Sequence, residues 1–396
     1  MSALVEFKNW YKGWHFPKLK MKETSIYIHI PFCDHKCIYC DFYSIINYEN
    51  TFNYLTALKK EIEFFSKLYN DERKIISIFF GGGTPSLMEV EYINEIIISL
   101  KSNFNILPNA EITLETNPGT VEKSKLEKFL SIGINRLSVG IQSFDNNDLK
   151  FLTRIHDSKT AIQTILDAKE VGFENISLDL IFNLPNQTKE KWKRNLEIAT
   201  SLPIKHISAY SLILERGTIL NKMVLEGKVK IQDEEHDADL YETTIDFLSL
   251  NNFHQYEVSN FAKENYECIH NNSYWHYKDY FGFGTSAHSF VNGKRWWNYS
   301  STKFYIESIN KKDNAIIGEE TLNKEEMLNE YIMLAFRSSG LNIIELEKKF
   351  GNEWLNKNKS IIDYLISNNL IIKQNDKLIF TPKGYALCDE IISKFL

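Results

Sequence analysis

The chain contains, at residues 27–44, the stretch Tyr27-Ile-His-Ile-Pro-Phe-Cys33-Asp-His-Lys-Cys37-Ile-Tyr-Cys40-Asp-Phe-Tyr-Ser44. Three cysteines within eight residues follow a short run rich in isoleucine that is typical of a strand. Thiolates are soft ligands that suit iron–sulfur clusters and zinc. The pattern therefore predicts that Cys33, Cys37 and Cys40 bind metal in the loop after the first strand.

A [4Fe–4S] cluster is the metal group that this spacing favours. A cubane normally takes four cysteines, so three cysteines leave one iron open to another ligand. The alternative is a zinc site, which needs a fourth Cys or His, and His29 and His35 lie close by. The other two cysteines, Cys268 and Cys388, are isolated, and five cysteines in this pattern make a poor disulfide framework. We therefore expect ligation in a reducing compartment and a cytoplasmic location.

Strand-like and helical patterns alternate outward from this loop. Strands are expected at 25–30, 75–80, 111–116, 136–141, 176–181 and 206–214, with helices near 51–68, 90–102, 122–131, 159–171 and 188–200. This alternation predicts an α/β fold in which helices cover a parallel sheet through right-handed connections. Six units are too few for a closed eight-stranded barrel, so we expect a partial (β/α)6 barrel.

Polar and glycine-rich segments follow the predicted strands at their carboxyl ends, where such sheets gather their chemistry. The stretch Gly81-Gly-Gly-Thr84 follows the second strand, and glycines let the backbone approach a charged amino-acid end. Glu115 and Asp179 can bind ribose hydroxyls or cations at the third and fifth strands. Gln142 offers a donor and an acceptor, and Arg154 can pair with a carboxylate. Each residue could be structural, but their joint placement favours a binding site.

Together these segments resemble the radical S-adenosylmethionine (SAM) superfamily and, within its oxygen-independent coproporphyrinogen III oxidase-like branch, the heme chaperone HemW family. The likeness runs from about residue 25 to about 290 and lies in residues 27–33, 40–44, 81–86, 115–119, 140–144, 154–156 and 179–185. It implies a [4Fe–4S] cluster on the three cysteines, with Tyr39 packed beside it. It also implies that SAM is bound by Tyr27, Gly82, Gly83, Thr84, Glu115, Gln142, Arg154 and Asp179.

Two positions distinguish between members of this branch. The true oxidase has a further cysteine two places after the third cluster cysteine, where this chain has Phe42, which speaks against oxidase activity. The stretch His270-Asn-Asn-Ser-Tyr-Trp275 resembles the His-Asn-x-x-Tyr-Trp motif of the HemW family, which is associated with heme handling. It makes His270 a candidate heme ligand. The alternative is a core segment in which the aromatic rings pack and His270 bonds a backbone carbonyl.

The pattern of elements along the chain also predicts a domain organisation. We expect an N-terminal extension at 1–24, the barrel at 25–215, a family-specific α/β region at 216–318 and a winged-helix-like domain at 319–396. The last domain is expected to contain helices near 324–337, 343–349 and 359–368, followed by a hairpin of 370–373 and 377–381. Winged helices often bind DNA, but a net charge of −6 gives no general attraction to nucleic acid, so a packing or partner-binding role is favoured.

The function that the resemblance implies is heme binding and delivery to acceptor hemoproteins, coupled to SAM cleavage that uses an electron donor such as flavodoxin or ferredoxin. The alternatives are a porphyrinogen oxidase or another radical oxidoreductase, and a radical enzyme acting on nucleic acid. The sequence contains no run of about 18 apolar residues, so it predicts no membrane span. Residues 1–24 lack the apolar core of a secretory signal and the arginines of a transit peptide.

Overall fold

The computed structural model describes residues 21–69 and 73–396. Its centre is a sheet of six strands paired in chain order: β1 (Lys22–Ile30), β2 (Arg73–Gly82), β3 (Ile106–Thr116), β4 (Arg136–Gln142), β5 (Asn175–Phe182) and β6 (His206–Ser211). All five pairings between these neighbours are parallel. The predicted α/β class and its parallel strands are therefore confirmed. Most of the predicted N-terminal extension lies outside the described residues, and β1 already begins at Lys22.

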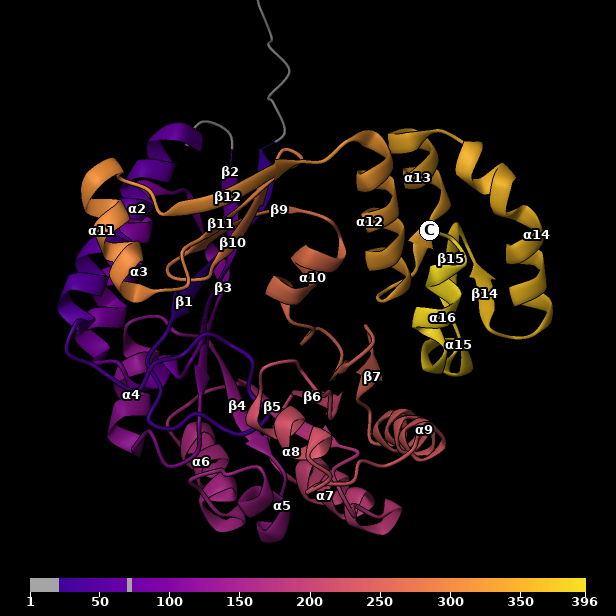
Figure 1. Cartoon of the computed structure of the whole chain (residues 1–396), viewed down its shortest axis with the longest axis horizontal. Coiled ribbons are helices and arrows are strands. Elements are labelled where there is room, and N and C mark those ends of the chain that lie inside the picture. Colours follow the sequence, from indigo (N-terminus) through magenta and orange to yellow (C-terminus); the bar gives the residue numbers. More distant parts are fainter. Residues whose placement is uncertain (1–20, 70–72) are drawn as a thin grey trace, which may run out of the picture.

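Helices cover the outer face of this curved sheet (Figure 1). They are α2 (Thr51–Tyr69), α3 (Val90–Asn103), α4 (Lys123–Ser131), α5 (Asn146–Phe151), α6 (Ser158–Glu170) and α7 (Lys189–Ser201), with a short 3-10 helix at Pro85–Leu87. Each longer helix turns an apolar stripe towards the strands, as Ile93, Ile97 and Leu100 do in α3. The covered strands are largely buried and contribute most of their apolar side chains to the main core.

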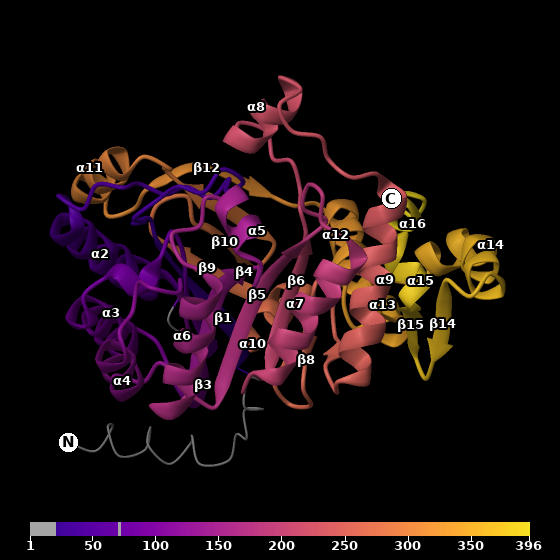
Figure 2. The ribbon, with the colours of Figure 1, turned by 90° about the horizontal axis from the view of Figure 1, so that it is seen from below.

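The region 216–318 extends the same sheet at both edges. At one edge β9 (Asp279–Phe283) runs parallel to β1, followed by antiparallel β10 (His288–Val291), β11 (Lys294–Asn298) and β12 (Ile316–Thr321). At the other edge lie β8 (Asn260–Ala262) and β7 (His254–Gln255). The helices of this region are α8 (Ile219–Leu225), α9 (Glu234–Leu250), α10 (Ile269–Trp275) and α11 (Thr302–Lys312), and α8 projects from the body (Figure 2). Since β12 crosses residue 319, the expected start of the last domain falls inside a strand.

The C-terminal segment has a core of its own. It comprises α12 (Lys324–Phe336), β13 (Leu341–Asn342), α13 (Ile343–Phe350), α14 (Glu353–Ser367), β14 (Ile371–Gln374), β15 (Lys377–Phe380), α15 (Pro382–Ala386) and α16 (Cys388–Ser393). Phe336, Trp354 and Phe380 lie in its apolar cluster, and β14 and β15 form the expected hairpin. This segment packs beside α9 and α10 (Figure 1). Its description as winged-helix-like stays a prediction.

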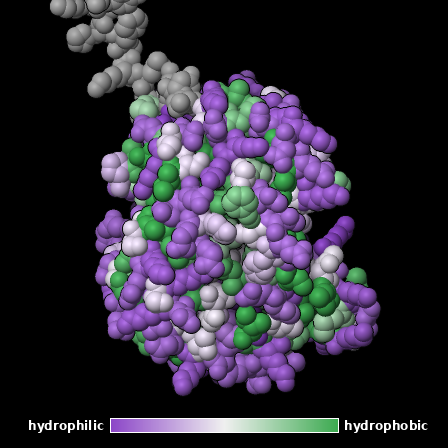
Figure 3. Space-filling model, turned by 90° about the vertical axis from the view of Figure 1, so that its left-hand side faces the viewer, coloured by the Kyte–Doolittle hydropathy of each residue, from purple (hydrophilic) through white to green (hydrophobic). Residues whose placement is uncertain are grey.

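The outer surface is mainly hydrophilic on the face shown in Figure 3, with apolar side chains scattered over it. Among the helices in residues 21–69 and 73–396, none combines the length and the apolar character needed to cross a bilayer.

A buried carboxyl group ties α2 to the strands added at the β1 edge. Glu61 accepts hydrogen bonds from the Tyr305 hydroxyl at 2.7 Å, from the Gly284 amide at 2.9 Å and from Asn298 Nδ2 at 2.6 Å. Burial raises the pKa of Glu61 to about 7, although these donors oppose the shift. One side chain therefore satisfies donors from α11, β11 and the turn after β9.

Replacing Glu61 by Ala should lower the free energy of unfolding by about 3 kcal/mol, because several buried donors lose their acceptor. Urea denaturation measures this change. Glu63→Ala is the matched control on the same helix, since Glu63 forms only an exposed ion pair with Lys67, and it should cost less than about 0.5 kcal/mol. Equal effects of the two substitutions would contradict the account.

Candidate functional site

The three clustered cysteines lie on a closed loop after β1, here called the cysteine loop (residues 31–45). The loop is closed by hydrogen bonds from Cys33 N to Ile45 O at 3.0 Å and from Ile45 N to Pro31 O at 2.7 Å. All three thiols are partly exposed and line one cleft of about 410 Å³ at the carboxyl ends of the parallel strands. The loop therefore presents its sulfur atoms together to a space that is large enough for a cofactor.

The glycine loop (residues 81–85) packs directly on the cysteine loop. Gly83 N donates to Ile30 O at 2.8 Å, and Thr84 N donates to Phe32 O at 2.7 Å. A Cβ on Gly83 would lie 2.5 Å from Phe32 O, and Gly82 has a φ of +113°. We predicted that these glycines let the backbone approach a ligand. The structure shows that Gly83 is also required for the contact between the two loops.

Arg154 joins the cysteine loop to the strand ends. Its Nη2 donates to Asn117 Oδ1 and to Gly140 O, each at 2.6 Å, and its Nη1 lies 3.5 Å from Cys37 Sγ. Asn117 Nδ2 in turn donates to Thr84 Oγ1 at 2.9 Å. The sequence analysis did not single out Asn117, although it lies within the stretch 115–119 that carries the resemblance. Arg154 is partly exposed, while its Nε atom is buried and has no hydrogen-bond partner among the described residues.

Two partly exposed carboxyl groups, those of Glu115 and Asp179, line the same cleft. Glu115 Oε2 accepts a hydrogen bond from Gly82 N at 3.2 Å, and Asp179 Oδ1 accepts one from Ser138 Oγ at 3.3 Å. Burial, and then the charge of Asp179, raise the pKa of Glu115 to about 8. Burial also raises the pKa of Asp179. The raised pKa values mean that neither carboxyl group is easily ionised in the protein alone. A cationic ligand would stabilise their ionised forms, so the pair suits a ligand with positive charge.

The two tyrosines of the predicted site have different surroundings. Tyr39 packs on a small apolar cluster of Leu152, Ile181 and Leu184 beside the cysteine loop. Tyr27 lies deeper, with its hydroxyl 3.1 Å from His29 Nδ1. Of the predicted residues, Tyr39, Gly82, Gly83, Thr84, Glu115, Gln142, Arg154 and Asp179 line the cleft together with the three cysteines. Tyr27 instead lines the cavity behind the cleft.

The histidines considered for a zinc site bond elsewhere. His29 Nε2 lies 3.0 Å from Tyr43 O, and His35 Nε2 lies 3.2 Å from Thr153 Oγ1. Within the described ranges, no three His, Cys, Asp or Glu side chains converge as ligands of a single metal ion. In a cubane, by contrast, each thiolate binds a different iron, so the sulfur atoms need not converge on one point.

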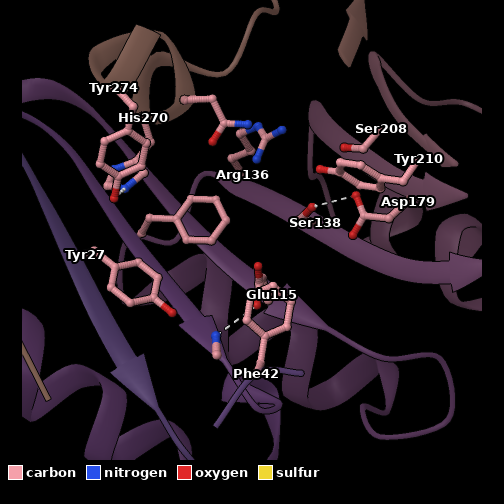
Figure 4. Close-up of a pocket in the computed structure, with 13 residues that line it drawn as sticks. Tyr27, Phe42, Glu115, Arg136, Ser138, Asp179, Ser208, Tyr210, His270 and Tyr274 are labelled. Carbon is pink, nitrogen blue, oxygen red and sulfur yellow. Dashed lines mark hydrogen bonds between the residues drawn. The ribbon is translucent and has the colours of Figure 1, made fainter. Parts of the chain in front are cut away.

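Behind the cleft, the interior of the barrel contains a second space of about 300 Å³, here called the lumen cavity (Figure 4). Glu115, Asp179 and Phe42 line both spaces, so the lumen cavity adjoins the cleft. Tyr210 also lines both spaces, and the far wall of the lumen cavity is formed by Tyr27, Phe79, Arg136, Ser208, His270, Asn271 and Tyr274. Sequence reasoning missed Arg136 and Ser208, because they lie within strands and carry no motif.

His270 is buried at the α10 wall of this cavity. Its Nδ1 lies 3.0 Å from Ser77 Oγ and its Nε2 lies 2.9 Å from the Tyr274 hydroxyl. Burial, with the charge of Arg136, lowers the pKa of His270 to about 3, so the ring is neutral. Both nitrogens are thus engaged with side chains rather than with the backbone carbonyl of the structural alternative. Ligation of heme iron would require one of these bonds to break.

Cys268 is the second heme-ligand candidate near this wall. It is fully buried, and its Sγ lies 3.5 Å from Glu111 Oε1. Burial raises the pKa of this thiol to about 12, so the group is a thiol rather than a thiolate. Cys388 is likewise buried, in the C-terminal core.

Comparisons with known proteins agree with this geometry. The family model of the radical SAM superfamily matches residues 27–199. The "Heme chaperone HemW" of Bacillus subtilis is 34% identical over 94% of this chain and 99% of its own length, and that of Haemophilus influenzae is 34% identical over 95% and 99%. The structure of coproporphyrinogen III oxidase (HemN) from Escherichia coli has the same fold, with a TM-score of 0.81 at 23% identity, over 96% of this chain and 91% of that one.

The chain therefore belongs to the radical SAM superfamily, whose members hold a [4Fe–4S] cluster and bind SAM. Within that superfamily it belongs to the family of the HemW proteins. The site fits both groups: three thiols are available for a cluster, and the guanidinium of Arg154 and the two carboxyl groups of the cleft suit an amino acid that carries a sulfonium. Family membership also sets aside the zinc alternative.

Replacing Cys33, Cys37 and Cys40 together by Ala should abolish cluster binding, because no other thiol lines the cleft. Iron analysis after anaerobic reconstitution should give about four irons per wild-type chain. Cys268→Ala and Cys388→Ala are the controls and should keep full iron content. Stoichiometric zinc without iron in the wild-type protein would contradict the cluster.

Arg154→Ala should weaken SAM binding by about 1.5–3 kcal/mol, the scale of a hydrogen bond to a charged group. Equilibrium dialysis with labelled SAM measures the change, and iron content shows whether the cluster survives. Unchanged SAM affinity in Arg154→Ala combined with Glu115→Ala would remove both residues from the SAM site.

Proposed function

We propose that this protein is a heme chaperone, which binds heme and delivers it to acceptor hemoproteins, with SAM cleavage coupled to that task. The observation that carries the proposal is the likeness to proteins named "Heme chaperone HemW" over nearly the whole length of both chains. The likeness includes the C-terminal domain and α10, which lie outside the residues matched by the superfamily model.

Different residues of the cleft would bind the cluster and SAM. Cys33, Cys37 and Cys40 hold the cluster, and the reduced cluster, when bound, supplies one electron for the cleavage of SAM. Arg154 would pair with the carboxylate of SAM through its guanidinium, and Glu115 and Asp179 would bind its cationic and ribose groups. The remaining residues of the SAM site are Tyr27, Tyr39, Gly82, Gly83, Thr84 and Gln142.

Phe42 supports this function over that of an oxidase. Its side chain is 62% exposed and lines both the cleft and the lumen cavity. The oxidase of this branch has a cysteine at the corresponding place. Phe42 offers the mouth of the site an apolar ring in place of a thiol, which suits contact with a flat porphyrin and provides no sulfur for proton or electron transfer.

The partners follow from the same proposal. An electron donor such as flavodoxin or ferredoxin would reduce the cluster, and the acceptors would be hemoproteins. A reducing, cytoplasmic setting fits free thiols at five positions and no disulfide pairing among them.

Anaerobic titration of the reconstituted protein with heme tests the function directly, with coproporphyrinogen III turnover assayed on the same sample. We expect saturable heme binding and no release of carbon dioxide from coproporphyrinogen III, because Phe42 replaces the oxidase cysteine. Catalytic decarboxylation would establish the oxidase alternative, and salt-sensitive binding of RNA or DNA would favour a role on nucleic acid.

His270→Ala tests whether the His-Asn-x-x-Tyr-Trp motif ligates heme. If the imidazole binds the iron, the variant should shift the Soret band or lose heme affinity while it still binds SAM. Cys268→Ala is the matched control that distinguishes imidazole from thiolate ligation. An unchanged spectrum and affinity in both variants would assign the motif to structure, in line with the two hydrogen bonds of the His270 ring.

A further inference from the structure

The lumen cavity contains a buried arginine whose charge is poorly matched. Arg136, the first residue of β4, is only 2% exposed and faces the cavity (Figure 4). Its Nε has no hydrogen-bond partner. Among the described residues its one ion pair, to Glu111, spans 3.8 Å, which is too long for a hydrogen bond. Buried charged groups are normally hydrogen-bonded, so an arginine in this state points to a ligand.

Arg73 is another buried arginine of this fold, and in contrast to Arg136 it forms hydrogen bonds with protein groups. It is 7% exposed and donates to Asp279 Oδ2 at 2.6 Å and to Thr24 Oγ1 at 3.2 Å. Glu111, the potential partner of Arg136, is already engaged with the first turn of α10. Its oxygens accept from the backbone amides of residues 269 and 270 at 3.3 and 3.1 Å. The guanidinium of Arg136 therefore remains available to a ligand in the lumen cavity.

We propose that the lumen cavity is a carboxylate subsite in which Arg136 binds a carboxylate group of the ligand. The planar guanidinium matches a carboxylate through two parallel hydrogen bonds, and Ser208 and Asn271 provide further polar groups on the same wall. Resting on the proposed function, the carboxylate is a propionate side chain of the porphyrin, which enters through the cleft past Phe42. A free small carboxylic acid is the other source of the same chemistry.

Glu115 and Asp179 line the same cavity, and their charges oppose an anion. The raised pKa of Glu115, about 8, leaves this group largely protonated at neutral pH. SAM in the adjoining cleft would place positive charge beside both carboxyl groups. That positive charge offsets the negative charge of the carboxyl groups, so the subsite is tested with SAM bound.

The experiment compares heme with heme dimethyl ester, in which both propionates are blocked, on the cluster-containing protein with SAM. Absorbance titration should show that the wild-type protein binds heme at least tenfold more tightly than the ester. In Arg136→Gln this ratio should fall to about one. Arg194→Gln is the matched control, because Arg194 lies on α7 with 76% of its side chain exposed, and its ratio should equal that of the wild type.

Equal affinity of the wild-type protein for heme and its ester would overturn the subsite and leave the heme function standing, a result that needs no variant. Failure of heme to bind would overturn the proposed function alone. Thermal unfolding in the presence of sodium propionate then tests the subsite. A midpoint temperature of unfolding that rises in the wild type but not in Arg136→Gln supports binding of a small carboxylate. No rise in either protein overturns the carboxylate subsite. A tenfold loss of SAM affinity in Arg136→Gln, with the cluster retained, would assign the guanidinium to SAM and also overturn the proposal.

Discussion

The site depends on the close approach of two loops at the carboxyl edge of the sheet. Gly83 N and Thr84 N donate to the carbonyls of Ile30 and Phe32, and there is no space for a side chain at Gly83. These two bonds hold the start of the cysteine loop on the end of β2. Asn117 and Arg154 then continue the connection from Thr84 to Cys37. The thiols are thereby positioned by strands β1 to β4 rather than by the loop alone.

The interior of the barrel is unusually polar for a space enclosed by strands. Arg136 and His270 lie there fully buried, and Glu115 and Asp179 lie there partly exposed. Loss of contact with water disfavours the charged forms of Glu115, Asp179 and His270. A purely structural core would replace such groups by apolar side chains at a gain in stability. Their presence beside the cleft indicates that they serve binding at some cost in folding stability. Bound ligands would supply the opposite charges that the protein itself does not provide.

The parallel core and the cysteine loop could be predicted from the sequence, because short β-rich segments alternate with helical ones and the cysteine spacing is distinctive. Strands β7 and β8 could not, since pairs and triplets such as His254–Gln255 and Asn260–Ala262 carry no periodicity. Asn117 and Arg136 were missed because their roles arise from contacts across the sheet. His270 is a candidate heme ligand from the sequence, and that role stays a prediction. Its bonds to Ser77 and Tyr274 could not be predicted, because they depend on how α10 packs into the barrel.

The central claim is that the three cysteines hold a cluster whose open iron binds SAM in the cleft. Electron paramagnetic resonance of the reduced protein, recorded with and without SAM, tests it most directly. The account predicts a signal of a reduced [4Fe–4S] cluster whose g-values change when SAM is added, because a ligand on one iron alters the electronic structure of the whole cluster. A cluster signal that is unchanged at saturating SAM, or the absence of any cluster signal, would contradict it.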